Sequence, residues 1–153
     1  MLGFDNNRSS HRYLSYTDRF AVTWVDQLLL VARVLAGWIF VQSGFSKVMD
    51  PVGFAGRLVP RGVPEWLGLL APFVEFIGGI MLVLGIGARY GALLIAFTVA
   101  ATWTSHRYWT FPEAQRGQQT SQFFKNLSMI GGLLALFVTG PGRFSLDRWL
   151  SRR

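Results

Sequence analysis

The chain has 153 residues, of which 51% are apolar, a formal net charge of +7, and no cysteine. The absence of cysteine excludes a disulfide framework, a thiol relay, an iron–sulfur cluster and a thiolate zinc site within this chain. The basic residues are scattered over termini and short connectors, so we expect anionic lipid head groups as their partners and no nucleic acid. With only His11 and His106 as imidazoles, we also expect no metal site.

The first half of the chain predicts a polar tail followed by two membrane-spanning helices. Residues 1–24 predict a polar tail with a mildly amphipathic end, and the first twenty of them lack the apolar core of a cleavable signal peptide. The apolar run Leu28–Phe45 predicts the first span. The connector Ser46–Glu65 is rich in Pro and Gly, and it predicts a short surface helix around Val52–Val59. The second span, Trp66–Ile86, has 21 residues, about enough helix to cross the ~30 Å hydrocarbon core of a bilayer.

The second half predicts two further spans. A tight turn at residues 85–89 leads into the third span, Tyr90–His106, in which Ala92, Ala96 and Ala100 recur every fourth residue and predict a packing stripe. A polar loop is expected at Arg107–Gln122.

The fourth span, Phe123–Thr139, ends at Gly140-Pro141-Gly142, and the basic, aromatic tail 143–153 is typical of an interfacial anchor with Ser145 as a helix cap. We therefore predict an all-α, integral membrane four-helix bundle with a short surface helix between its first two spans. Its parts are a tail (1–24), the bundle (25–142) and a C-terminal tail (143–153).

The distribution of Lys and Arg predicts the orientation of this bundle. Four spans place both termini on one side. The termini and the turn at 87–89 together hold eight Lys and Arg residues, and the other two connectors hold five. By the positive-inside rule both termini are predicted to be cytoplasmic in a multi-pass membrane protein.

Glu75 is the residue around which a functional hypothesis forms. It is the one charged residue in the second span, and a carboxylate at that depth costs on the order of 2–3 kcal/mol. Intramembrane charges usually face the bundle interior, where they find a partner. From helix depth at ~1.5 Å per residue we predict a Glu75–Arg33 pair. Above this pair we expect a polar pocket with the candidate ligand-binding residues Lys47, Gln42, His106, Lys125 and Asn126.

Two interpretations of such a pair stay open from the residues alone. Buried ion pairs fix helix register without chemistry and add little net stability. Intramembrane charges are also enriched at ligand and proton sites.

Several segments together resemble the DoxX family of small four-helix membrane proteins. They are FVQSGFSKVMDP, the connector PVGFAGRLVPRGVP, APFVEFIGGIMLVLGIGAR, HRYW and FFKNLSMIGGLLALFVTGPGRFSLDR. The resemblance covers about Leu28 to Trp149. The residues at positions expected for the family are Gly44, Lys47, Glu75, Gly79, Arg89, His106, Lys125, Asn126 and the Gly140–Asp147 run.

The resemblance implies a bacterial inner-membrane location and an association with membrane redox systems, since relatives include a thiosulfate:quinone oxidoreductase. It implies that a quinone or similar lipid-soluble ligand enters the pocket and bonds to Lys125, His106 or Glu75. With no Cys, the chain would be an accessory oxidoreductase subunit that depends on protein partners or a bound organic cofactor. The alternatives are a non-catalytic membrane scaffold or assembly factor, and transport of a proton or small anion.

Overall fold

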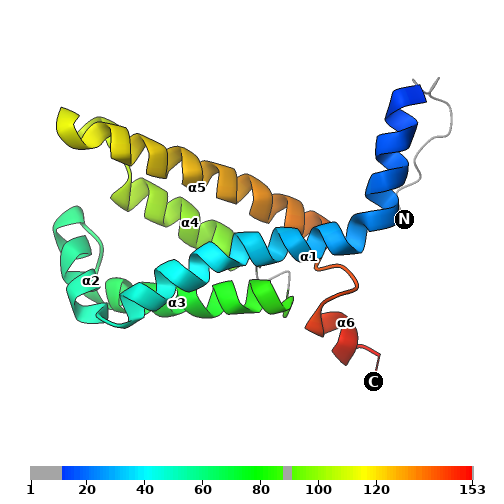
Figure 1. The fold of residues 1–153 in the computed structure, drawn as a ribbon. Coiled ribbons are helices and arrows are strands. Elements are labelled where there is room, and N and C mark those ends of the chain that lie inside the picture. The colour runs from blue at the N-terminus through cyan, green and yellow to red at the C-terminus, as the bar shows by residue number, and fades with distance from the viewer. Residues whose placement is uncertain (1–11, 88–90, 153) are drawn as a thin grey trace.

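The computed structural model describes residues 12–87 and 91–152, and all the regular secondary structure in these ranges is helical, as predicted. The first eleven residues of the predicted tail, and Arg89 in the predicted turn, lie outside the described residues. Both ends of the described chain lie at the same end of the molecule (Figure 1). The elements are α1 (Arg12–Val48), α2 (Pro51–Leu58), η1 (Val59–Arg61), α3 (Glu65–Leu84), α4 (Gly91–Ser105), η3 (Tyr108–Thr110), α5 (Glu113–Thr139) and α6 (Leu146–Leu150).

Three described helices are long and apolar enough to cross a membrane: Tyr16–Val48 within α1, all of α3, and α5. The described part of α4 has 15 residues and extends about 22 Å, which is shorter than the ~30 Å hydrocarbon core. The described residues thus hold three candidate membrane-spanning helices, and the prediction of exactly four spans stays a prediction.

Two helices extend beyond the predicted spans. α1 begins at Arg12, inside the predicted tail, and α5 begins at Glu113 after Pro112 at its N-cap. The prediction of a polar loop over Arg107–Gln122 is wrong, because η3 and the first ten residues of α5 occupy that segment. An apolar run marks the part of a helix suited to lipid, and it carries no information on polar turns that continue outside the bilayer. The predicted surface helix is present as α2, capped by Asp50.

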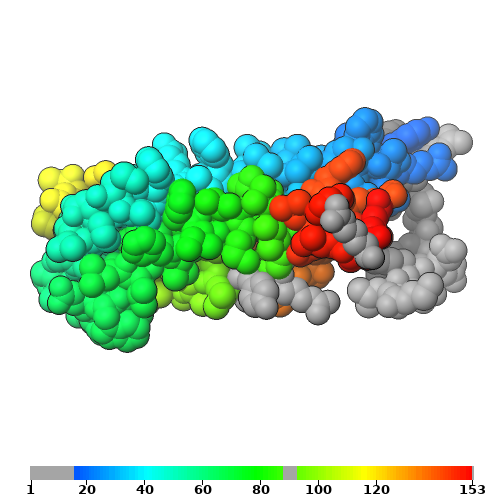
Figure 2. All heavy atoms as spheres, turned by 90° about the horizontal axis from the view of Figure 1, so that it is seen from below, coloured from blue at the N-terminus to red at the C-terminus, as the bar shows by residue number. Residues whose placement is uncertain are grey.

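The helices α1 and α3 pack side by side as an antiparallel pair (Figure 1). A Cβ built on Gly44 would lie 2.6 Å from the main-chain N of Phe76, and one on Gly79 would lie 2.8 Å from the main-chain N of Val41. The missing side chains therefore let the two backbones approach closely, as small residues do in membrane helix pairs. Figure 2 shows α3 in green along α1, with the C-terminal segment in red against the end of α3.

The packing face of α4 differs from the predicted one. Ala96 and Ala100 are exposed, whereas Leu94, Thr98 and Thr102 are buried. The two threonine hydroxyls donate to the carbonyls four residues earlier, at 2.7 and 2.6 Å, so their burial leaves no polar atom unpaired. Alanine spacing alone was a poor guide to the buried side. A small apolar core joins Leu94 to side chains of the neighbouring helices, namely Phe40, Leu82, Leu133 and Leu136.

Candidate functional site

The carboxylate of Glu75 is buried in α3 and is paired with Lys47 near the end of α1. Lys47 Nζ lies 2.6 Å from Glu75 Oε2, and the side chains are 26% and 6% exposed respectively. Gly44 brings the two helices together one turn before Lys47. The Lys47 ammonium also lies 5.3 Å from the centroid of the Phe54 ring. The buried charge of Glu75 is thus balanced from α1, by a side chain that retains access to solvent.

The predicted Glu75–Arg33 pair is wrong. The antiparallel register places Gly44 beside Phe76, while the Arg33 guanidinium fills the space where a side chain on Gly85 would stand. Gly85 follows Glu75 by ten residues, which is about 15 Å along a helix. An arginine side chain does not span that distance. The depth estimate failed because it measured Arg33 from the end of an apolar run instead of from its contacts with α3.

Arg33 instead secures the C-terminal segment. Its side chain is 1% exposed, and Nη2 donates to the carbonyl oxygen of Phe144 at 2.5 Å. Nε and Nη1 have no hydrogen-bond partner among the described residues. Nearby, the main-chain N of Asp147 donates to Gly85 O at 3.2 Å, and Asp147 Oδ1 accepts from the main-chain N of Gly87. These contacts attach the segment after α5 to the end of α3.

The Lys47–Glu75 pair lines a cavity of about 410 Å³, which we call the polar cavity. Its wall contains five of the seven predicted site residues: Lys47, Glu75, His106, Lys125 and Asn126. Arg33 and Gln42 do not line it, and Gln42 is exposed on α1. The helices α1, α3, α4 and α5 thus direct polar groups to one place, and their role in binding stays a prediction.

His106 lies beyond the end of α4 and contacts Gln119 of α5. Its Nδ1 is 2.8 Å from Gln119 Oε1, so Nδ1 donates and Nε2 is left as an acceptor. Burial lowers the pKa of the His106 imidazole, the Gln119 bond raises it, and the positive charges of Lys125, Arg61 and Lys47 lower it further. The net direction is downward from 6.5. The ring is therefore neutral at pH 7, with one nitrogen able to accept a hydrogen bond.

The α5 side of the polar cavity holds a cation and several amides. Lys125 Nζ donates to Gln122 Oε1, and Asn126 is 7% exposed. Gln118, Gln119 and Gln122 also line the cavity, and sequence reasoning missed them because it assigned them to a loop. Their spacing was the available signal: Gln118, Gln122 and Lys125 recur at four and three residues, which places them on one helix face.

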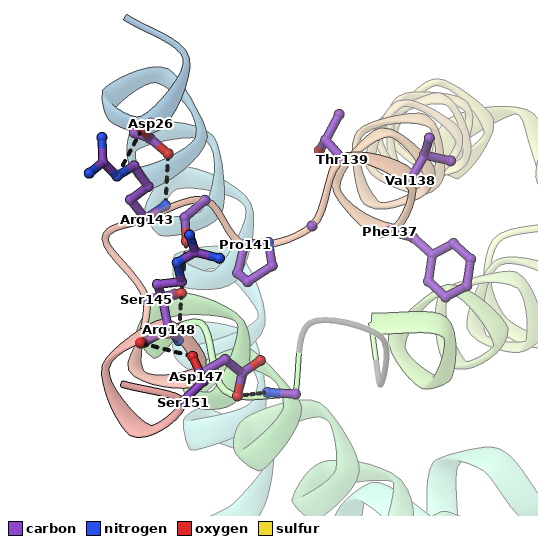
Figure 3. Close-up of a pocket in the computed structure, with 13 residues that line it drawn as sticks. Asp26, Phe137, Val138, Thr139, Pro141, Arg143, Ser145, Asp147, Arg148 and Ser151 are labelled. Carbon is purple, nitrogen blue, oxygen red and sulfur yellow. Dashed lines mark hydrogen bonds and ion pairs between the residues drawn. The ribbon is translucent and has the colours of Figure 1, made fainter. Parts of the chain in front are cut away.

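A larger cavity, of about 790 Å³, lies at the C-terminal end between α1, the end of α5 and α6 (Figure 3). Asp26 Oδ1 accepts from the main-chain N of Arg143 at 2.7 Å, and Ser145 caps α6 by accepting from the main-chain N of Arg148. The predicted cap is confirmed. None of the predicted site residues lines this cavity, and its polar groups hold the C-terminal segment in place. The polar cavity is therefore the better candidate site.

The fold and the cavity define a small helical membrane protein whose helices enclose a polar, ion-paired site. The chain belongs to the DoxX family: the family model described as DoxX matches residues 28–107. The inner membrane protein YqjF of Escherichia coli is 35% identical over 129 residues, covering 84% of this chain and 95% of the relative. The inner membrane protein YphA of the same organism is 35% identical over 124 residues, covering 79% and 89%.

A more distant relative, the putative oxidoreductase CatD of Bacillus subtilis, is 30% identical over 70 residues, covering 46% of this chain and 52% of the relative. No solved structure matches the chain. Among the described residues, no three His, Cys, Asp or Glu side chains gather closely enough to hold a metal ion.

Proposed function

We propose that the chain is an integral subunit of a redox-linked complex in the bacterial inner membrane, with both termini cytoplasmic. We propose further that its polar cavity holds the head group of a quinone or a similar lipid-soluble ligand. The observation that carries this proposal is the convergence of Lys47, Glu75, His106, Lys125 and Asn126 on one cavity of about 410 Å³. The names of the two inner membrane relatives and of CatD support the location and the redox link.

The chemistry of the cavity suits a quinone head group. Quinone carbonyls accept hydrogen bonds, and Lys125 and the Asn126 amide supply donors on the α5 side. A quinol hydroxyl donates, and the neutral His106 leaves Nε2 as an acceptor. Ile39, Phe40, Phe97 and Met129 provide apolar wall, and the volume lies within the ~300–1,000 Å³ typical of small-molecule sites. A bound quinone would supply reversible electron and proton transfer, and the residues here would bind and orient it.

The direct test is ligand binding by the purified chain in detergent. A short-chain quinone is titrated into the wild type and into the Glu75→Gln and Lys125→Ala variants, with Arg116→Gln as the control on the exposed surface of α5. We expect each cavity variant to weaken binding by about tenfold or more. Lys125→Ala removes a charged donor, and Glu75→Gln removes the carboxylate charge that holds the Lys47 ammonium in the cavity wall. The control should bind as the wild type does. Absence of binding by the wild type, or equal affinity in all folded variants, would refute the proposal.

The 2.6 Å bond between Lys47 and Glu75 also favours a second candidate, a non-catalytic scaffold or assembly factor in which this pair fixes α1 against α3. That role predicts that Lys47→Glu or Glu75→Lys alone lowers the yield of assembled protein. The exchange of both charges in one variant should then restore part of it. Full assembly of a Glu75→Gln variant that fails to bind quinone would decide for the ligand site.

A further inference from the structure

A third cavity, of about 510 Å³, lies beside the polar cavity, and we call it the α2 groove. It is bounded by α2 and η1, by the first turns of α3, and by the last part of α4. Leu58, Leu67, Ala71 and Phe97 give it a largely apolar wall. The two cavities share four residues, Lys47, Phe97, Ala101 and His106, yet Glu75, Lys125 and Asn126 line only the polar cavity. The α2 groove is thus a separate site with its own chemistry.

The charged residues that line the α2 groove are all positive. Lys47, Arg57 and Arg61 belong to its wall, and no Asp or Glu does. Lys47 is held by Glu75, whereas neither Arg57 nor Arg61 has an ion-pair partner in the part of the chain that the structure describes. The Arg57 guanidinium lies 5.8 Å from the centroid of the Phe54 ring, so its planar group sits at the groove and keeps its charge available.

Charge and apolar surface are arranged along the groove in a definite order. Arg57 and Arg61 lie on α2 and η1, before α3 begins at Glu65. Ala71 follows Glu65 by six residues, about 9 Å into the span, and Phe97 precedes the end of α4 by eight residues, about 12 Å. The groove therefore has positive charge at the level of the helix ends and apolar surface at the depth of the acyl chains. A phospholipid matches this order, because its charged phosphate lies at the membrane surface and its acyl chains lie deeper.

We propose that the α2 groove binds one anionic phospholipid of the surrounding bilayer. Its phosphate lies against Arg57 and Arg61, and one acyl chain follows Leu67, Ala71 and Phe97. A guanidinium binds phosphate oxygens through paired hydrogen bonds, and basic pockets between membrane helices are suited to anionic head groups. The uniform positive charge selects an anion, so this ligand differs from the neutral quinone assigned to the polar cavity.

Native mass spectrometry of the full chain, extracted in detergent, tests this proposal. Phosphatidylglycerol and phosphatidylcholine with identical acyl chains are added separately, and the fraction of protein that retains one lipid is measured. We expect the wild type to retain phosphatidylglycerol preferentially. The Arg57→Gln/Arg61→Gln variant should lose at least about tenfold in affinity, because two charged hydrogen-bond donors are removed. The control Arg19→Gln/Arg116→Gln removes the same charge from exposed positions on α1 and α5, and should retain the lipid.

A third variant separates the groove from general surface charge. Ala100 is exposed and lines the groove, so Ala100→Trp fills part of the acyl-chain path while every charge stays in place. We expect weaker retention of phosphatidylglycerol by this variant. Equal retention of the two lipids by the wild type would overturn the proposal, as would equal losses in the two double variants or an unaffected Ala100→Trp. Lys125 lines only the polar cavity and bonds to Gln122, so Lys125→Ala tests the quinone proposal without changing the α2 groove, and the two proposals fail independently.

Discussion

The two side chains of the Lys47–Glu75 pair are buried to different extents. We therefore expect that removing one charge or the other lowers the free energy of unfolding by different amounts. Lys47→Met leaves a carboxylate in a side chain that is 6% exposed, with its partner gone. Removal of one partner from a fully buried pair costs about 3–5 kcal/mol. Because the Lys47 side chain is 26% exposed, solvent already screens the pair, and we expect a loss of about 2–3 kcal/mol in the free energy of unfolding.

In Glu75→Gln the buried charge itself is removed, and the unpaired group is the partly exposed ammonium of Lys47. The ammonium of Lys47 keeps its access to solvent and its position near Phe54, and the new amide keeps an oxygen that accepts a hydrogen bond. We therefore expect a loss of only about 1 kcal/mol. The double variant Lys47→Met/Glu75→Gln removes the stranded carboxylate, so it should be more stable than Lys47→Met alone.

The assay is unfolding of the purified protein in mixed micelles by a denaturing detergent, followed by circular dichroism for the wild type and the three variants. Arg116→Met, at an exposed position on α5, serves as the control and should change the free energy of unfolding by less than about 0.5 kcal/mol. Equal losses for the two single variants would refute the reasoning, as would a larger loss for Glu75→Gln. Either result would mean that Glu75 is not the more strongly desolvated partner.

Three further predictions follow from the packing and charges. Gly44→Ala places a Cβ 2.6 Å from the Phe76 main chain and should cost about 1–3 kcal/mol of stability. A Cβ on Gly131 meets no atom within 4 Å beyond its own stretch of helix, so Gly131→Ala should be neutral or stabilising in the same unfolding assay. Arg33→Met removes the bond to Phe144 O and should speed tryptic cleavage of the C-terminal segment; unchanged cleavage would contradict its anchoring role. The lowered pKa of His106 means that the unfolded chain binds this proton more readily, so stability should fall as pH drops below about 6.5, by up to about 1.4 kcal/mol per pH unit, and His106→Asn should reduce that slope.

The place of the polar cavity could be predicted because its residues lie near the ends of apolar runs. Lys47 follows the first run, while His106 and Lys125 lie at the edges of the third and fourth. Helices that cross a bilayer in alternating directions bring such ends together on one side. The apolar runs therefore indicated which polar residues share a level, and the structure brings these three together around Glu75.

The partner of Glu75 could not be predicted in the same way. Helical periodicity puts Arg33 and Lys47 on one face of α1, because fourteen residues are close to four turns. It does not say which of them meets Glu75, since that depends on how far α3 slides along α1. The register is set by glycine contacts between the two helices, such as Gly44 with Phe76. The bond from Arg33 to Phe144 joins residues 111 positions apart, and no local pattern in the sequence encodes it.

The register of α3 against α1 also bears on the choice between ligand binding and transport of a proton or anion through the bundle. Arg33 and Lys47 are about 21 Å apart along α1, and the packed, buried side chains of Phe40, Leu82 and Leu133 lie between their levels. The polar groups thus form two clusters, one at each end, instead of one seam along the bundle. A proton or anion crossing within a single chain would have to pass that apolar layer, where its hydration is lost without replacement. A ligand that enters from one end meets no such barrier, which is why the geometry favours a binding site at the α2 end.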